Sequence, residues 1–181
     1  MNFGFTDEQR EIKDTARSLL WRRRAFEQAR AGFQLALWEE LRVLGWPGVA
    51  VGAEYGGGGL GIVELTILAE ELGYALAAVP LLASAAAAAV IERAGSPEQR
   101  ARWLPGLADG SFRGALGLDS ESLVADAPEA DVVVAVHEGA AWSSTRHSMS
   151  EASSASLRKV VILPPNTDRS GAPAPSSISR R

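Results

Sequence analysis

The chain has 181 residues, 46% of them hydrophobic and 22% charged, so it is long enough to bury the core of one domain or two small ones. Its formal net charge of −4 argues against a nucleic-acid-binding role, because no basic face offsets repulsion by phosphates. The absence of cysteine excludes disulfides, a thiolate nucleophile and cysteine metal ligands.

The sequence gives no signal for export or for membrane insertion. Residues Met1 to Arg10 lack the apolar stretch of a signal peptide. The apolar run from Leu81 to Ile91 is too short and too rich in alanine to span a bilayer. We therefore expect a cytoplasmic protein.

Apolar residues recur at helical spacing in five segments: after Thr6, Phe33 to Leu44, Ile62 to Leu72, Leu81 to Ala94, and from Ser96 onward. The first begins with a capping box, because Gln9 follows Thr6 at the required spacing. Gly73 is expected to cap the third helix. Pro105 is expected to break or restart the fifth, with residues 106–110 forming a turn.

The glycine run Gly56 to Gly59 lies between two of these helices. Some of its residues are expected to need a positive φ or a close approach of backbone atoms. A phosphate-binding loop is the alternative, but no Lys-Ser or Lys-Thr pair follows the run and no clear βα unit contains it. A tight turn between helices is the favoured interpretation.

Beyond Gly110 the apolar pattern changes to that of strands, predicted over Arg113 to Leu118, Asp131 to Val136, Ala140 to Thr145 and Leu157 to Leu163. The chain is expected to return antiparallel through His137, Glu138 and Gly139. From Pro164 the composition favours disorder. The predicted organisation is a mainly α domain over residues 1–112, a short incomplete antiparallel β region over 113–163 and a disordered tail over 164–181.

No set of residues has the spacing of a catalytic or metal site. Glu70 and Glu71 are adjacent on a helix and point about 100° apart, so a salt bridge or a solvated carboxylate is favoured over acid–base chemistry. His137 and His147 have no carboxylate or second histidine at ligand spacing, which argues against a metal centre. The serines between residues 143 and 156 lack the context of a nucleophile elbow.

The order of several short motifs over about residues 3–110 resembles the N-terminal half of acyl-CoA dehydrogenases. The motifs are Phe5-Thr6-Asp7-Glu8-Gln9, Trp38-Glu39-Glu40-Leu41, Leu44-Gly45-Trp46-Pro47-Gly48, Glu54-Tyr55-Gly56-Gly57, Glu70-Glu71-Leu72-Gly73, Val79-Pro80-Leu81-Leu82-Ala83-Ser84, Gly95-Ser96-Pro97-Glu98-Gln99 and Arg102-Trp103-Leu104-Pro105. Members of this family typically have a helical N-terminal domain, a middle β-domain and a C-terminal helical bundle.

The resemblance implies FAD-dependent oxidation of an acyl-CoA thioester to the 2,3-enoyl-CoA, usually by dimers or tetramers. In the family a glutamate abstracts the α-proton while the flavin takes the β-hydride. In most of the family that glutamate lies in the C-terminal bundle, and no residue of this chain matches it. FAD and an acyl-CoA are the cofactor and substrate that the resemblance implies.

Two groups of site residues follow from the resemblance. Asp119 and Ser120 stand where the family usually holds the flavin with a Thr-Glu pair and a Gly-Ser-Asp turn. The helix after Pro80 lies beside the acyl end in the family, so its small residues are expected to leave room for a long or bulky acyl group: Ala83, Ser84, Ala87 and Ala88. Close helix packing through these alanines is the alternative.

Three interpretations of the function follow. The chain is an acyl-CoA dehydrogenase part that is inactive alone, a non-catalytic subunit that completes an acyl-CoA dehydrogenase assembly, or a helical interaction module. The first two imply oligomers with acyl-CoA dehydrogenase subunits as partners. Flavin absorption and co-purification distinguish them.

Overall fold

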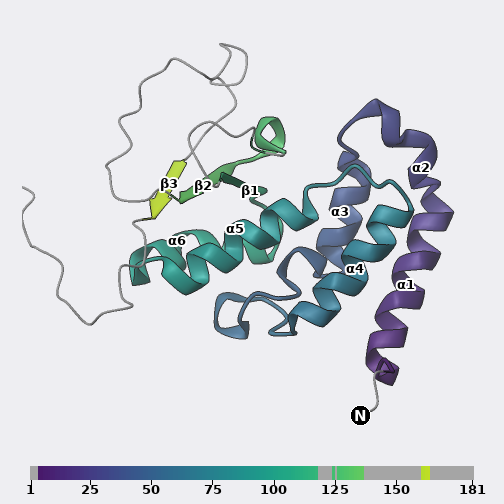
Figure 1. The fold of residues 1–181 in the computed structure, drawn as a ribbon, viewed down its shortest axis with the longest axis horizontal. Coiled ribbons are helices and arrows are strands. Elements are labelled where there is room, and N and C mark those ends of the chain that lie inside the picture. Colours follow the sequence, from purple (N-terminus) through teal and green to yellow (C-terminus); the bar gives the residue numbers. More distant parts are fainter. Residues whose placement is uncertain (1–3, 118–123, 125, 137–159, 164–181) are drawn as a thin grey trace, which may run out of the picture.

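The computed structural model describes residues 4–117, 124, 126–136 and 160–163. These contain the helices α1 (Asp7–Arg23), α2 (Ala25–Gln28), α3 (Leu35–Val43), α4 (Ile62–Tyr74), α5 (Leu81–Ala94) and α6 (Pro97–Ala108), the 3-10 turns η1 (Ala29–Ala31), η2 (Trp46–Gly48), η3 (Ala53–Tyr55) and η4 (Ala127–Glu129), and the strands β1 (Gly114–Gly117), β2 (Val132–Val136) and β3 (Val160–Leu163). In Figure 1, α1 and α4 lie at one end of the molecule, while α5 and α6 lie beside the sheet.

The mainly helical prediction is confirmed, and all five expected helices form. The Thr6 hydroxyl accepts the backbone N–H of Gln9, and the Gln9 side chain accepts the N–H of Thr6, so the predicted capping box starts α1. Ser96 and Gln99 form the same arrangement at the start of α6. The short helix α2 was not expected from the sequence pattern.

Two predicted helix ends are wrong. Gly73 does not cap α4, because this helix continues to Tyr74 and ends at Ala75 with right-handed backbone angles. Pro105 does not break α6, which runs on to Ala108 and includes part of the expected turn. The buried side chains of Trp103, Leu104 and Leu107 hold the helix together around the hydrogen bond that the proline lacks.

The strands pair in parallel, so the predicted antiparallel arrangement is wrong. The order is β1-β2-β3, with Gly114 opposite Val132 and Val133 opposite Val160. The direction is fixed where β1 and β2 begin: the backbone carbonyl of Arg113 accepts the N–H groups of Asp131 and Val132. The expected strand over Ala140 to Thr145, with its turn, lies outside the described residues.

Helix α5 lies between two parts of the core. One cluster packs α1, α3 and α4 against the first turns of α5 and includes Trp38, Leu41 and Leu68. The other packs the rest of α5 against α6 and β2 and includes Ile91 and Val132. The alanine-rich centre of α5 brings these neighbours close because its side chains have little volume.

Backbone atoms approach one another closely in the loop that contains Gly48 and the glycine run, as predicted for the run. Gly56 and Gly59 have φ of +84° and +62°. The backbone N–H of Gly58 donates to the Gly48 carbonyl at 2.8 Å, which folds the run back onto η2. A Cβ at Gly48 would lie 2.5 Å from the Ala108 carbonyl oxygen, so η2 and the end of α6 are nearly in backbone contact.

A buried carboxylate on α4 fastens this helix to basic side chains of α1. The Arg17 guanidinium donates to both carboxylate oxygens of Glu71, at 2.8 and 3.0 Å, and Lys13 Nζ lies 3.4 Å from the same carboxylate. The Glu71 side chain is 4% exposed. Burial raises the pKa of Glu71, but the hydrogen bonds and positive charges of Arg17 and Lys13 outweigh this and hold the pKa below its ordinary value.

Glu70 and Glu71 therefore take separate positions, as their spacing on the helix predicts. The Glu70 side chain is 53% exposed, and its Oε2 lies 2.8 Å from Lys13 Nζ. Glu71, in contrast, is buried in the contact between α1 and α4. A lowered pKa keeps Glu71 ionised and makes it a poor proton acceptor. Its carboxylate is structural.

We expect Gly48→Ala to lower the free energy of unfolding by about 2 kcal/mol, because the added methyl group meets the backbone of Ala108. Gly73→Ala is the matched control. It adds the same methyl group inside α4, where nothing lies within 4 Å, and should gain about 0.5–1 kcal/mol from helix propensity. Urea unfolding of both variants tests this, and an equal loss in both would contradict it.

We expect Glu71→Gln to lower the free energy of unfolding at pH 7 by about 1–3 kcal/mol, with Glu70→Gln nearly neutral as the control. Because the folded state lowers the pKa of Glu71, its contribution is complete above the ordinary value of 4.5. That contribution is lost as the pH falls through the lowered pKa. Urea unfolding between pH 7 and pH 3 should therefore show the native chain and the Glu71→Gln variant converging in acid, whereas a constant gap would disprove the ion pair.

Candidate functional site

The residues predicted to border an acyl group lie where α5 packs on β1. The Ser84 hydroxyl accepts the backbone N–H of Gly114 at 2.9 Å and is buried with it. Ala87 and Ala88 are also buried, at 0% and 3% exposure, whereas Ala83 is half-buried. The structure thus brings three of the four side chains into the core between helix and strand.

Gly114 shows how close this contact is. A Cβ at this position would lie 2.7 Å from the Ala87 Cβ and 3.1 Å from Leu107 Cδ2. Ala87 is therefore in tight contact with the first residue of β1, as the packing alternative expects. Ala83 is the member of the group with exposed surface. A role of these residues beside an acyl group stays a prediction.

Asp119 and Ser120, the predicted flavin contacts, lie outside the described residues. The glycine run, the other candidate for phosphate binding, has no free donors. The backbone N–H groups of Gly56, Gly57, Gly58 and Gly59 donate to the carbonyls of Ala53, Gly52, Gly48 and Val51, respectively. Since these donors are engaged within the loop, the turn interpretation is confirmed over a phosphate cradle.

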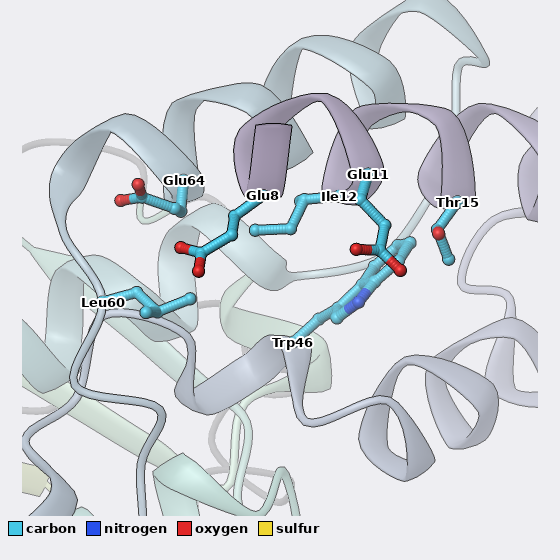
Figure 2. A pocket seen from close by; sticks show the side chains of 7 residues that line it. All are labelled: Glu8, Glu11, Ile12, Thr15, Trp46, Leu60 and Glu64. Carbon is cyan, nitrogen blue, oxygen red and sulfur yellow. The ribbon is translucent and has the colours of Figure 1, made fainter. Parts of the chain in front are cut away.

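Figure 2 shows a pocket that the sequence patterns did not predict. It has a volume of about 490 Å³ and combines an apolar floor with carboxylates from two helices. Its lining residues are Glu8, Glu11, Ile12 and Thr15 of α1, Trp46 of η2, Leu60 and Glu64. The spacing of Glu8, Glu11, Ile12 and Thr15 puts them on one face of a helix, which is the signal that the sequence carries for this pocket.

The pocket is strongly negative. Glu64 Oε1 accepts the side-chain amide of Gln9 at 2.8 Å, and Oε2 accepts the backbone N–H of Gly61 at 2.9 Å. The hydrogen bond from Gln9, together with backbone hydrogen bonds, lowers the pKa of Glu64. Glu8 and Glu11 have no ion-pair partner within the described part of the chain.

Three carboxylates in one pocket repel phosphates, so the pocket does not suit the pyrophosphate of FAD or of coenzyme A. The pocket instead favours a group that is both cationic and apolar.

Other sequence candidates give no site. His137 and His147 lie outside the described residues. Within residues 4–117 and the short described segments that follow, no three histidine, aspartate or glutamate side chains gather closely enough to hold a metal ion. No helix of the described chain is long and apolar enough to cross a bilayer.

Comparison with known proteins identifies the helical part. Residues 6–111 match the family model described as acyl-CoA dehydrogenase, N-terminal domain. The acyl-CoA dehydrogenase fadE12 of Mycobacterium tuberculosis is 44% identical over 78 residues, which are 42% of this chain and 20% of that protein. The acyl-CoA dehydrogenase IpdE2 of the same species is 32% identical over 149 residues, covering 78% of this chain and 46% of that one.

A solved structure supports the same assignment. The Tcur3481-Tcur3483 steroid ACAD G363A variant is 35% identical and superposes with a TM-score of 0.58, covering 65% of this chain and 34% of that one. The chain spans less than half of the length of the curated relatives it matches. The matched helical residues, with their order and their packing around α5, show that this chain belongs to the acyl-CoA dehydrogenase family.

Proposed function

We propose that the chain supplies the N-terminal helical part of an FAD-dependent acyl-CoA dehydrogenase and is inactive until other protein parts complete the site. The observation that carries this is the family match over residues 6–111 in a chain that covers less than half of its relatives. The only buried carboxylate of the described residues, Glu71, is engaged by Arg17 and Lys13. It is therefore not available as the base that removes the α-proton.

In this proposal the protein's contribution is to orient the acyl group and to enclose it. FAD, when bound to the completed assembly, accepts the hydride from the acyl group. The α5–β1 contact forms one wall of the acyl site, with Ala83 at its exposed edge. Asp119 and Ser120, two and three residues beyond the end of β1, lie next to the flavin. The protein works in the cytoplasm on a fatty acyl or related thioester.

A second candidate function is that of a non-catalytic subunit. The name of the 35% identical structure joins two components, Tcur3481 and Tcur3483. Several large apolar side chains of this chain are exposed, including Val43 and Tyr74, both at 88%. Contact with an acyl-CoA dehydrogenase subunit would remove such side chains from water. In this case the partner carries the base and most of the flavin site.

Flavin content tests the proposal. We expect the purified chain to be colourless, and to acquire flavin absorption only when it is co-expressed with an acyl-CoA dehydrogenase subunit that supplies the C-terminal bundle. Co-purification with flavin and acyl-CoA oxidation supports the first function. Co-purification without any change in the partner's own activity supports the second. A chain that holds flavin by itself would contradict both.

Variants of α5 test the acyl wall in the completed assembly. We expect Ala83→Leu to reduce kcat/KM for long acyl-CoA substrates about tenfold relative to short ones, because it fills space at an exposed edge. Ala87→Leu is the control for packing. Its larger side chain meets Gly114, so it should lower the free energy of unfolding by about 1–3 kcal/mol. An unchanged preference in the Ala83→Leu variant would disprove the wall.

A further inference from the structure

The indole ring of Trp46 carries a polar group that the fold leaves without a partner. Trp46 begins η2 and packs in the core cluster of α1, α3 and α4, so that only 7% of its surface is exposed. A buried tryptophan normally finds an acceptor for its N–H, as Trp38 does at the Gly110 carbonyl. The indole N–H of Trp46 donates to no group in the part of the chain that the structure describes.

This N–H is not sealed inside the core. Among the described side chains that are not exposed, Arg100 Nε is the one nitrogen or oxygen that is both inaccessible and unpaired. The unpaired Nε1 of Trp46 therefore keeps contact with the solvent. The ring lines the pocket of Figure 2, where it extends from η2 toward the carboxylate of Glu11. The small exposed part of Trp46 thus places a hydrogen-bond donor at the wall of the pocket.

The rest of the pocket offers acceptors and apolar surface. In Figure 2, Glu8 and Glu64 lie with Leu60 on one side of the pocket. Glu11 lies with the Trp46 ring on the other side. Glu64 is fixed in place by two hydrogen bonds, whereas Glu8 and Glu11 have no ion-pair partner among the described residues. The pocket therefore has carboxylates on both sides and the indole donor on one.

The spacing of the carboxylates selects the kind of cation. The described carboxylates are not gathered closely enough to coordinate a metal ion. An organic cation fits better, since its ammonium group can approach a carboxylate while an alkyl chain covers Ile12 and Leu60. The volume of about 490 Å³ is in the range of small-molecule sites. A hydroxyl group on the same molecule would accept from the Trp46 N–H and donate to the Glu11 carboxylate at once.

We propose that the pocket binds a free amino alcohol, in which a short alkyl chain joins a primary ammonium group to a hydroxyl group. The ammonium group lies at the carboxylates of Glu8 and Glu64. The hydroxyl group bridges the Trp46 N–H and the Glu11 carboxylate, and the chain lies on the apolar floor. This site goes beyond the proposed enzymatic function and does not rest on it.

The indole N–H signal of Trp46 in nitrogen–proton correlation spectra of the isotope-labelled full chain tests this proposal. The chain has five tryptophans, and the Trp46→Phe variant identifies the signal of Trp46. Titration with 5-amino-1-pentanol should shift this signal in a saturable way, with a dissociation constant of about 1–10 mM for so small a ligand. 1-Pentanol, which lacks the ammonium group, should give no saturable shift. An absent or non-saturating shift with the amino alcohol, or an equal response to 1-pentanol, would overturn the proposal.

Pentylamine separates the hydroxyl contact from the ionic contact. It should bind the native chain about threefold to fivefold more weakly than 5-amino-1-pentanol, because it leaves the Trp46 N–H without an acceptor. In Trp46→Phe, which keeps an aromatic ring without the N–H, the two amines should bind equally, as followed by the backbone signals of α1. Circular dichroism melting shows whether this variant is folded. Equal affinities of the two amines for the native chain would by themselves disprove the contact with Trp46.

Removal of single carboxylates locates the ammonium group. Glu8→Gln should weaken the binding of 5-amino-1-pentanol about threefold to tenfold, because a charge-assisted hydrogen bond is lost. Asp14→Asn is the matched control, since it removes one charge from an exposed position of α1 outside the pocket. It should change the affinity by less than about twofold, as a screened charge does. If both substitutions weaken binding equally, the proposed site is wrong.

Discussion

The close approach of α5 to β1 is the contact on which both parts of the core depend. Gly114 leaves no room for a side chain, Ala87 contributes only a methyl group, and the Ser84 hydroxyl accepts the first backbone N–H of the strand. With the strand held this near, α6 packs on one side of α5 and the α1–α4 layer begins at its first turns. Larger side chains at these positions would separate the sheet from the helices.

The same contact limits how much acyl-binding chemistry can be assigned to α5. A small side chain can leave space for a ligand or allow another backbone to come close. At Ala87 the second use is visible, because β1 occupies the space. Ala83 lies about one turn earlier and keeps exposed surface. Neighbouring alanines of one helix therefore differ in their surroundings, because Ala87 is packed against β1 whereas Ala83 keeps exposed surface.

Much of the helical domain was predictable from local signals. The capping residues Thr6 and Ser96 mark the starts of α1 and α6, and the bounds of α5 were predicted as Leu81 to Ala94. Strand direction was not predictable, because it depends on bonds between Arg113 and Asp131, eighteen residues apart. Pro105 is a local signal that tertiary packing overrides. The pocket was also missed, since its walls come from α1, η2 and the start of α4.

The side chain of Gln9 joins the beginnings of two helices. Its carbonyl oxygen caps α1 at Thr6, and its amide group binds Glu64, whose carboxylate holds the backbone N–H of Gly61 at the start of α4. Gln9 and Glu64 are 55 residues apart in the chain. During synthesis on a ribosome, α1 leaves the exit tunnel before α4 does, so its amphipathic face and its charged residues at first lack their partners. The first helix to be made therefore gains these partners only once α4 has been made.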